Sequence, residues 1–429
     1  MKDNYKRYIV FWLSQAVSQL GSQLTGFALI LWAYSQSRSA MAVSLMSFFN
    51  YVPYIFVSLA AGAFVDAHSK KKIMLVSDTI AAVCSFIVLF LGMSGGLRIY
   101  HIYIVNFVIG MMNAFQGPAS AVAVGQMVPE EKLAQVSGMN SFSGNLIMVL
   151  APVLSASLFA FGGLTIVLVI DLASFAVAFA VLLFYIRIPE HEYEKSDKKA
   201  IGAGCAEGFR YLRHNRMIFA IVVTMALLNL FSRLTYENIL SPMILARSGN
   251  DSLTLGIVNA VMGIGGIVGG ILVAAGKFSK NSVKMIYFSA MISFLLGDLL
   301  MGMGRGVVLW SFAGLMASLP IPFINAGQNV IFYRTVPVEM QGRVFAVRNA
   351  IQFCTVPIGI LLGGFLADYV FEPFMASENA VALALQMLVG KGAGSGMAVM
   401  FLCTGILGST FSWIFYKKGY ANDGQNFAY

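Results

Sequence analysis

Twelve long apolar stretches run through this chain almost from end to end, separated by short polar segments. Only 11% of the residues are charged, whereas an ordinary globular domain carries about 25%. A helix needs about 20 apolar residues to cross roughly 30 Å of hydrocarbon, so twelve such helices use nearly all of the chain. Continuous apolar runs form helices, because barrel strands alternate and lipid offers backbone groups no partner. The sequence therefore predicts an all-α integral membrane protein.

The stretches define twelve predicted transmembrane helices. They are residues 8–33, 42–65, 73–93, 99–124, 133–161, 164–186, 217–246, 253–275, 283–303, 307–333, 344–370 and 396–416. The segment 371–395 lies between the last two and is rich in glycine, so we expect a flexible loop there.

The 28 lysine and arginine residues are distributed unevenly between the two sides of the predicted membrane region. When the side is switched at each apolar stretch, 22 of them fall on the side of the N-terminus, five fall on the other side, and Arg233 lies inside a stretch. The five on the other side are Arg38, Arg98, Arg247, Arg305 and Lys391. Translocation disfavours basic residues close to helix ends, so this bias sets the orientation of the chain. We expect both termini to lie in the cytoplasm.

A polar segment divides the chain into two halves of six stretches each. We predict an N-terminal bundle at 1–186, a cytoplasmic linker at 187–216 and a C-terminal bundle at 217–429. A shift of 208 positions aligns Val-Pro-Glu-Glu at 128–131 with Val-Pro-Val-Glu at 336–339, and also aligns Gly62 with Gly270. Two related six-helix halves are a transporter architecture. The sequence thus predicts two pseudo-symmetric six-helix bundles with a site between them.

Two loops carry motifs of a known family. Gly62, Asp66, Lys70 and Lys71 match the signature G-x-x-x-D-R-x-G-R-K, although alanine and serine replace its first arginine and second glycine. The segments 334–345 and 364–368 are similar to segments of drug exporters. The chain resembles the major facilitator superfamily, in particular its drug-efflux branch, which includes macrolide exporters. This resemblance implies a monomer in the bacterial inner membrane, with the four matching residues forming a conformational latch.

Charged residues within the apolar stretches are candidates for function, because a charge in hydrocarbon is expensive. Arg233 and Glu237 lie four apart in the seventh stretch, so they share one helix face and are within pairing reach. We expect Glu237 to be the proton-coupling carboxylate and Arg233 its partner; the alternative is a static ion pair. For Asp78, Asp171 and Asp298 we expect structural roles near an interface, and Asp171 is the strongest of the three as an alternative proton carrier.

Uncharged polar side chains form a second set of candidates. In the first stretch they recur with helical period, and in this family the stretches concerned line a central cavity. The set comprises Gln15, Gln19, Gln23, Asn113, Gln116, Asn229, Tyr236, Asn325, Gln328 and Gln352. Such groups suit an amphipathic substrate with hydroxyl and ester groups, but they also serve as hydrogen bonds between helices.

Other classes of function lack the residues that they need. The four histidines show no metal-ligand spacing, and neither H-E-x-x-H nor G-x-x-x-x-G-K-[ST] occurs, so we expect no enzyme, no metal and no cofactor. The net charge of +9 follows the cytoplasmic bias and suits anionic lipid rather than nucleic acid. The sequence favours a proton-coupled exporter of amphipathic molecules such as macrolides, working by alternating access. A siderophore or lysophospholipid exporter and an energy-independent lipid flippase or facilitator are the alternatives.

Overall fold

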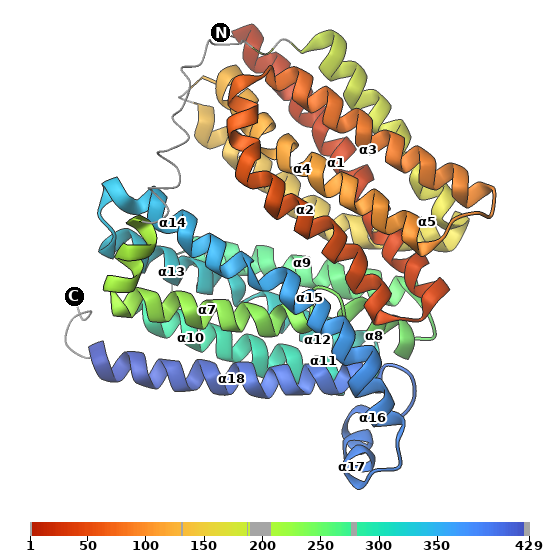
Figure 1. Ribbon diagram of the computed structural model, residues 1–429, viewed down its shortest axis with the longest axis vertical. Helices are drawn as coiled ribbons and strands as arrows, with labels where there is room; N and C mark the ends of the chain where they lie inside the picture. The colour runs from red at the N-terminus through yellow and green to blue at the C-terminus, as the bar shows by residue number, and fades with distance from the viewer. Residues whose placement is uncertain (1, 130–131, 187, 189–206, 276–280, 424–429) are drawn as a thin grey trace. The chain divides into compact units, whose positions relative to one another are not determined.

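The computed structural model describes the chain except residues 1, 130–131, 187, 189–206, 276–280 and 424–429 (Figure 1). Helices are the only regular elements in the described part. Ten of them are long and apolar enough to cross a membrane, which agrees with the all-α membrane protein that the sequence predicts. Most of the predicted linker at 187–216, and Glu130 and Glu131 of the repeated motif, lie outside the described residues.

Two features separate these ten helices from the twelve predicted ones. The stretches 133–161 and 164–186 both fall in the continuous element α5 (Leu133–Ala180), whose backbone leaves the helical conformation only at Gly162 and Gly163. Gly163 has a φ of 64°, which glycine adopts without strain. The first stretch lies in α1 (Lys2–Ser37), which is not among the ten and whose hydropathy is lowered by glutamines and serines.

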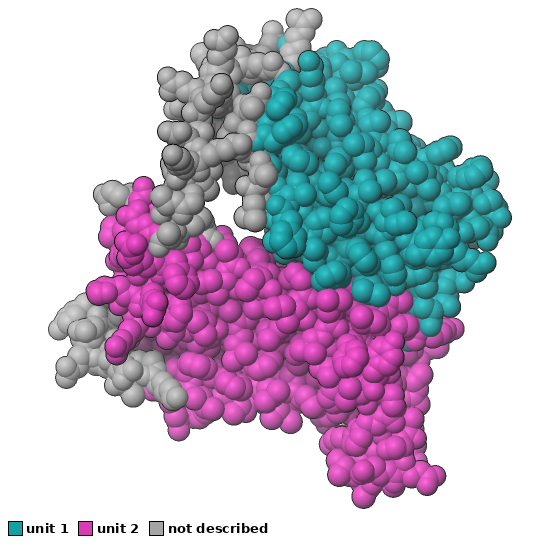
Figure 2. Space-filling view, viewed as in Figure 1, with its two compact units in different colours: residues 1–37, 45–196 teal, residues 38–44, 197–429 magenta. Residues whose placement is uncertain are grey.

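The chain forms two compact units (Figure 2). Unit 1 comprises residues 1–37 and 45–196, and unit 2 comprises residues 38–44 and 197–429. Besides α1 and α5, unit 1 contains most of α2 (Ala40–Ala67), α3 (Lys70–Met93), α4 (Ile99–Met127) and the π-helical turn η2 (Val181–Tyr185). Within it α1 packs along α5, and α3 packs along α4. Buried side chains such as Leu24, Ile102 and Leu168 form its core.

Unit 2 holds the remaining elements, and several of its membrane helices are interrupted. In chain order they are α7 (Arg216–Thr235), α8 (Leu240–Arg247), α9 (Ser252–Ala274), α10 (Ser282–Ile292), η3 (Ser293–Asp298), α11 (Leu299–Met303), α12 (Val307–Ser318), α13 (Ile321–Thr335), α14 (Val338–Phe353), α15 (Thr355–Leu366), η4 (Ala367–Phe371), α16 (Glu372–Ala376), α17 (Ala380–Val389) and α18 (Ser395–Asp423). Here α7 packs on α15, α9 on α12, and α10 on α13 and α18.

The segment 371–395 differs from its prediction. It contains the end of η4 and the helices α16 and α17, so it is not simply a flexible loop. Its glycines are confined to a short turn after α17, where Gly390, Gly392 and Gly394 all have positive φ. The apolar run 380–389 is only ten residues long, and the glycines that follow it are typical of a loop.

Candidate functional site

Arg233 and Glu237 form an ion pair in unit 2. Arg233 lies in the last turn of α7, whereas Glu237 lies in the turn at 236–239 that separates α7 from α8. The pair therefore sits where the candidate span Arg216–Arg247 is interrupted. The side chains are 33% and 20% exposed, so neither is sealed in the core. A charged pair beside a helix break can be disturbed by a change of bend or by a proton.

The end of α7 and the turn that follows it pack closely against α15. A Cβ atom at Gly359 would lie 2.7 Å from the Cβ of Arg233, and one at Gly363 would lie 2.5 Å from the carbonyl oxygen of Leu234. Small residues four apart let two helix backbones approach closely in a membrane. Asn238, in the same turn as Glu237, donates from its amide to the carbonyl of Ile360 at 2.8 Å. The interruption of the seventh span is thus held against a groove of glycines.

Asp171 is the centre of a hydrogen-bond cluster in unit 1. It is 5% exposed and accepts hydrogen bonds from three hydroxyl groups. The donors are Thr25 Oγ1 at 3.0 Å, Ser85 Oγ at 3.0 Å and Ser22 Oγ at 3.3 Å. Among the described residues, no lysine or arginine forms an ion pair with it. Hydroxyl groups can donate to a carboxylate or accept from a carboxylic acid, so the cluster suits both protonation states.

Unit 2 contains a second buried carboxyl group. Asp298, at the end of η3, is 1% exposed and accepts a hydrogen bond of 2.7 Å from Thr404 Oγ1 on α18. Tyr236 lies beside it, with its ring edge-on to Phe401 at 5.2 Å between centroids. The Tyr236 hydroxyl is buried on the same side as the Asp298 carboxyl group. Its place in a substrate cavity stays a prediction.

The other uncharged candidates fall into three groups. Some bind one another or an acid: Gln116 Nε2 donates to Asp78 at 2.9 Å, and Gln352 Nε2 donates to Gln328 at 3.2 Å. The exposed ones are Gln19 and Gln23 on α1, Asn113 on α4 and Asn325 on α13. Asn229 and Gln15 are half-buried, and the amide nitrogen of Gln15 has no hydrogen-bond partner among the residues that the structure describes. The exposed side chains are the ones free to meet a substrate.

Of the four residues of the proposed latch, Lys71 has defined side-chain contacts. Lys71 Nζ donates to the carbonyls of Leu183 at 2.9 Å and Ile186 at 2.8 Å, at the end of η2 in its own unit. A cation is favoured at a helix C-terminus, so Lys71 stabilises the packing of the start of α3 against the end of η2. Lys70 is buried, and the side-chain surroundings of Gly62 and Asp66 lie outside the described part of the chain.

Two further polar residues were not selected from the sequence. Arg348 on α14 lies 5.0 Å from the ring centroids of both Phe332 and Phe345 and donates to Asn329 Oδ1 at 3.0 Å. Asp368 in η4 accepts from the backbone N–H groups of Ala40 and Met41 at 3.1 and 2.9 Å, and so caps the start of α2. Both lie within the predicted stretch 344–370, so a charge inside an apolar stretch is the signal that could have revealed them.

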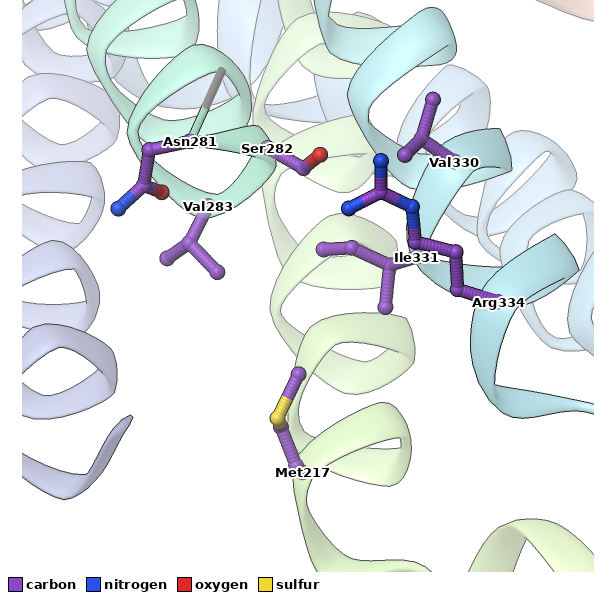
Figure 3. A pocket seen from close by; sticks show the side chains of 7 residues that line it. All are labelled: Met217, Asn281, Ser282, Val283, Val330, Ile331 and Arg334. Carbon is purple, nitrogen blue, oxygen red and sulfur yellow. The ribbon is translucent and has the colours of Figure 1, made fainter. Parts of the chain in front are cut away.

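A small hollow opens at the ends of α7, α10 and α13 (Figure 3). It is lined by Met217, Asn281, Ser282, Val283, Val330, Ile331 and Arg334. Figure 3 shows the guanidinium of Arg334 directed into it. None of the candidate residues lines this hollow, so it is separate from the site considered above. No group of acidic, histidine or cysteine side chains suited to a metal ion occurs in the described residues.

Comparison with known proteins agrees with this architecture. The profile of the Major Facilitator Superfamily matches residues 11–353. Macrolide efflux protein A of Streptococcus pyogenes is 27% identical over 374 residues, covering 85% of this chain and 91% of that protein. The multidrug efflux pump Tap of Mycolicibacterium fortuitum is 23% identical over 388 residues, covering 86% and 89%.

Solved structures share the fold at low sequence identity. The nucleoside transporter NupG has a TM-score of 0.68 at 15% identity, covering 96% of this chain and 99% of that one. A bacterial homologue of the human lysosomal transporter Spinster has a TM-score of 0.67 at 13% identity, covering 97% and 98%. The family profile, the apolar helices and the shared fold agree. The chain belongs to the Major Facilitator Superfamily.

Proposed function

We propose that this protein is a proton-coupled exporter of amphipathic small molecules, including macrolide-like drugs, and that it works by alternating access. The relatives named for macrolide and multidrug efflux align with 85% and 86% of the chain, and these alignments support export as the direction. Among the described residues there is no metal cluster, and the sequence contains no phosphate-binding motif. An ion gradient is then the natural source of energy for transport.

The proposal includes twelve membrane spans with both termini in the cytoplasm. The candidate span Phe142–Tyr185 has 44 residues, which is about 66 Å at 1.5 Å per residue and twice the thickness of the hydrocarbon. The break at Gly162 and Gly163 divides it into two spans of ordinary length. Counting α1 as a further span gives twelve. An even number of spans with 22 basic residues on the side of the N-terminus supports cytoplasmic termini.

The Arg233–Glu237 pair at the break between α7 and α8 is the observation that carries the proposal. Proton binding by Glu237 removes its negative charge and with it the ion pair. The turn at 236–239 is then free to change its bend, because the pair no longer bridges it. Loss of the proton restores the pair. Asp171 in unit 1 is the second candidate proton carrier, since its hydroxyl cluster suits both protonation states.

Substrate contacts are assigned to the exposed amides. Gln19, Gln23, Asn113 and Asn325 present hydrogen-bond donors and acceptors on otherwise apolar helices. Such side chains match hydroxyl and ester groups on a largely apolar molecule. Asn229 and Gln15 are half-buried, and Gln352 donates to Gln328 within unit 2; they are assigned secondary contacts with the substrate. The loop with Gly62, Asp66, Lys70 and Lys71 is assigned the role of a conformational latch.

The test is the accumulation of a radiolabelled macrolide in efflux-deficient cells. Wild type, Glu237→Gln and an empty vector are compared with and without a protonophore. Glu378→Gln is the matched control, because Glu378 is an exposed glutamate outside the candidate spans. We expect low accumulation in wild type and in the control. The protonophore should raise both to the level of the empty vector, and Glu237→Gln should show high accumulation in either condition. Accumulation in wild type equal to that of the empty vector would contradict macrolide export.

A further inference from the structure

The helix α17 presents an apolar face that none of the described residues of unit 2 covers. Its exposed side chains include Val381 at 58%, Leu383 at 45%, Met387 at 78% and Leu388 at 51%. With Ala380 and Ala384 they occupy one continuous side of the helix, and that side carries no polar side chain. A helix facing water normally has its polar residues on the outer side. The arrangement in α17 is the reverse.

The inner side of α17 is the one that packs on unit 2. Ala382 and Val389 are buried there, and the helix contacts α11, α16 and α18. The one polar residue of the helix, Gln386, is also on this side and donates to the carbonyl of Met375 at 2.8 Å. The inner side of α17 thus accounts for its contacts with unit 2, and the outer side is left for a neighbour outside that unit.

Both ends of α17 are satisfied by protein groups rather than left to water. Asn379 Oδ1 accepts from the N–H of Val381 at 2.9 Å and caps the start. At the other end Arg305 donates to the carbonyl of Met387 at 3.1 Å, and Arg247 donates to that of Val389. The carbonyls of the last helical turn otherwise need water or a cap. Internal partners for these groups suit a place where water is scarce.

The position of α17 in the chain identifies the neighbour. It lies between the candidate spans Arg343–Ala376 and Ser395–Lys417, so both of its connections lead straight into membrane helices. Figure 1 shows α16 and α17 projecting from unit 2 past α18. The neighbouring span ends also carry exposed apolar side chains, Met303 on α11 and Val370 in η4. The chain therefore leaves one membrane helix, enters α17 and returns directly to another membrane helix, which favours lipid as the neighbour of its outer side.

We propose that α17 is an interfacial helix that lies at the membrane surface with its outer side in lipid. Ten residues correspond to about 15 Å, too short to cross the hydrocarbon but sufficient to lie along its boundary. Short helices with one apolar side bind membranes in this way. The two arginines at its C-terminus sit at the depth where basic side chains meet lipid headgroups. The inference depends on membrane location and not on transport or its coupling.

Lipid contact can be measured with an environment-sensitive fluorophore. The four native cysteines are replaced, and single cysteines at Met387 and Leu383 are labelled with NBD in the full chain, reconstituted in phosphatidylcholine and phosphatidylglycerol vesicles. The matched controls are Glu378→Cys and Lys391→Cys, which are exposed residues flanking the same helix. Quenching is compared between aqueous iodide and lipids whose nitroxide lies near the headgroup or near the acyl-chain end.

We expect the labels at Met387 and Leu383 to lose most of their fluorescence to the nitroxide near the headgroup, less to the deep nitroxide and little to iodide. The labels at the two control positions should be quenched by iodide. Iodide quenching at Met387 as strong as at Lys391 would place the helix in water and overturn the proposal. Protection from all three quenchers would also overturn it, because the face would then be covered by protein, such as a second copy of the chain.

Discussion

Asp171 in unit 1 and Glu237 in unit 2 show two ways of keeping a carboxyl group in a membrane helix. Asp171 is solvated by hydroxyl groups from two other helices, since Ser22 and Thr25 are on α1 and Ser85 is on α3. Glu237 is instead neutralised by an arginine one turn earlier in the same span. The first arrangement joins three helices of one unit. The second bridges a helix break.

Replacing Asp171 should mainly affect the stability of the protein, and replacing Glu237 should mainly affect transport. Removing Asp171 should loosen the packing of unit 1, because three hydroxyl groups, two of them buried, lose their acceptor. Removing the charge of Glu237 should leave packing nearly intact, because its side chain is 20% exposed and its partner is 33% exposed. The same change, however, abolishes the ion pair that responds to a proton. Single substitutions at the two positions test whether stability and efflux can be changed independently.

Glu237→Gln should have the largest effect on transport. The amide keeps the size of the side chain but cannot gain or lose a proton at neutral pH. We expect efflux in cells to fall to the level of the empty vector, while the purified variant keeps the melting temperature of wild type within experimental error. Wild-type efflux by Glu237→Gln would remove this residue from the coupling step.

Asp171→Ala should have the largest effect on stability. Hydrogen bonds between membrane helices contribute about 0.6 kcal/mol each on average, so the loss of three costs about 2 kcal/mol. Asp171→Asn keeps an acceptor and should recover most of the loss. The measurement is thermal unfolding of the purified protein in detergent.

The efflux of Asp171→Asn, corrected for the amount of folded protein, sharpens this comparison. We expect it to stay close to wild type. A stable Asp171→Asn protein without efflux would transfer the coupling role to unit 1 and would contradict the assignment of Glu237.

Arg233→Lys should have an intermediate effect. It keeps the positive charge but loses the planar guanidinium, which fits a carboxylate better than an ammonium group does. We expect reduced efflux that remains sensitive to a protonophore. Arg210→Lys is the control, because Arg210 is exposed and lies outside the candidate spans. Full activity of Arg233→Lys would mean that charge alone, without paired geometry, is sufficient.

Ser85→Ala should have the smallest effect. It removes one donor to Asp171, at a cost of about 0.6 kcal/mol and at most about 1.7 kcal/mol. Ser157→Ala is the control, since that hydroxyl donates only within its own helix, to Val153. Thermal unfolding of Thr25→Ala, Ser85→Ala and the double variant measures their coupling. Additive losses would show that the cluster does not act as a unit.

Local spacing predicted some of these features well. The separation of four residues between Arg233 and Glu237 was enough to place them together, because a helix turn fixes that distance. The pair of glycines at 162–163 lies where the predicted fifth and sixth stretches separate, because glycine permits the backbone conformation found there.

Contacts between distant segments could not be predicted in the same way. Thr25 and Asp171 are 146 residues apart, and their hydrogen bond depends on how α1 and α5 are rotated against each other. The periodicity of α1 places Gln19 and Ser22 on one stripe, but it does not reveal that Ser22 binds Asp171 while Gln19 stays exposed. The cap that Asp368 provides for α2 is of the same kind, since it joins residues 328 apart.

Proton movement by the purified protein tests the central claim most directly. Wild type, Glu237→Gln and Asp171→Asn are reconstituted in vesicles that contain a pH-sensitive dye, and a macrolide gradient is imposed across the membrane. We predict dye responses of similar size for wild type and Asp171→Asn, and none for Glu237→Gln. A response of Glu237→Gln equal to that of wild type would contradict the account.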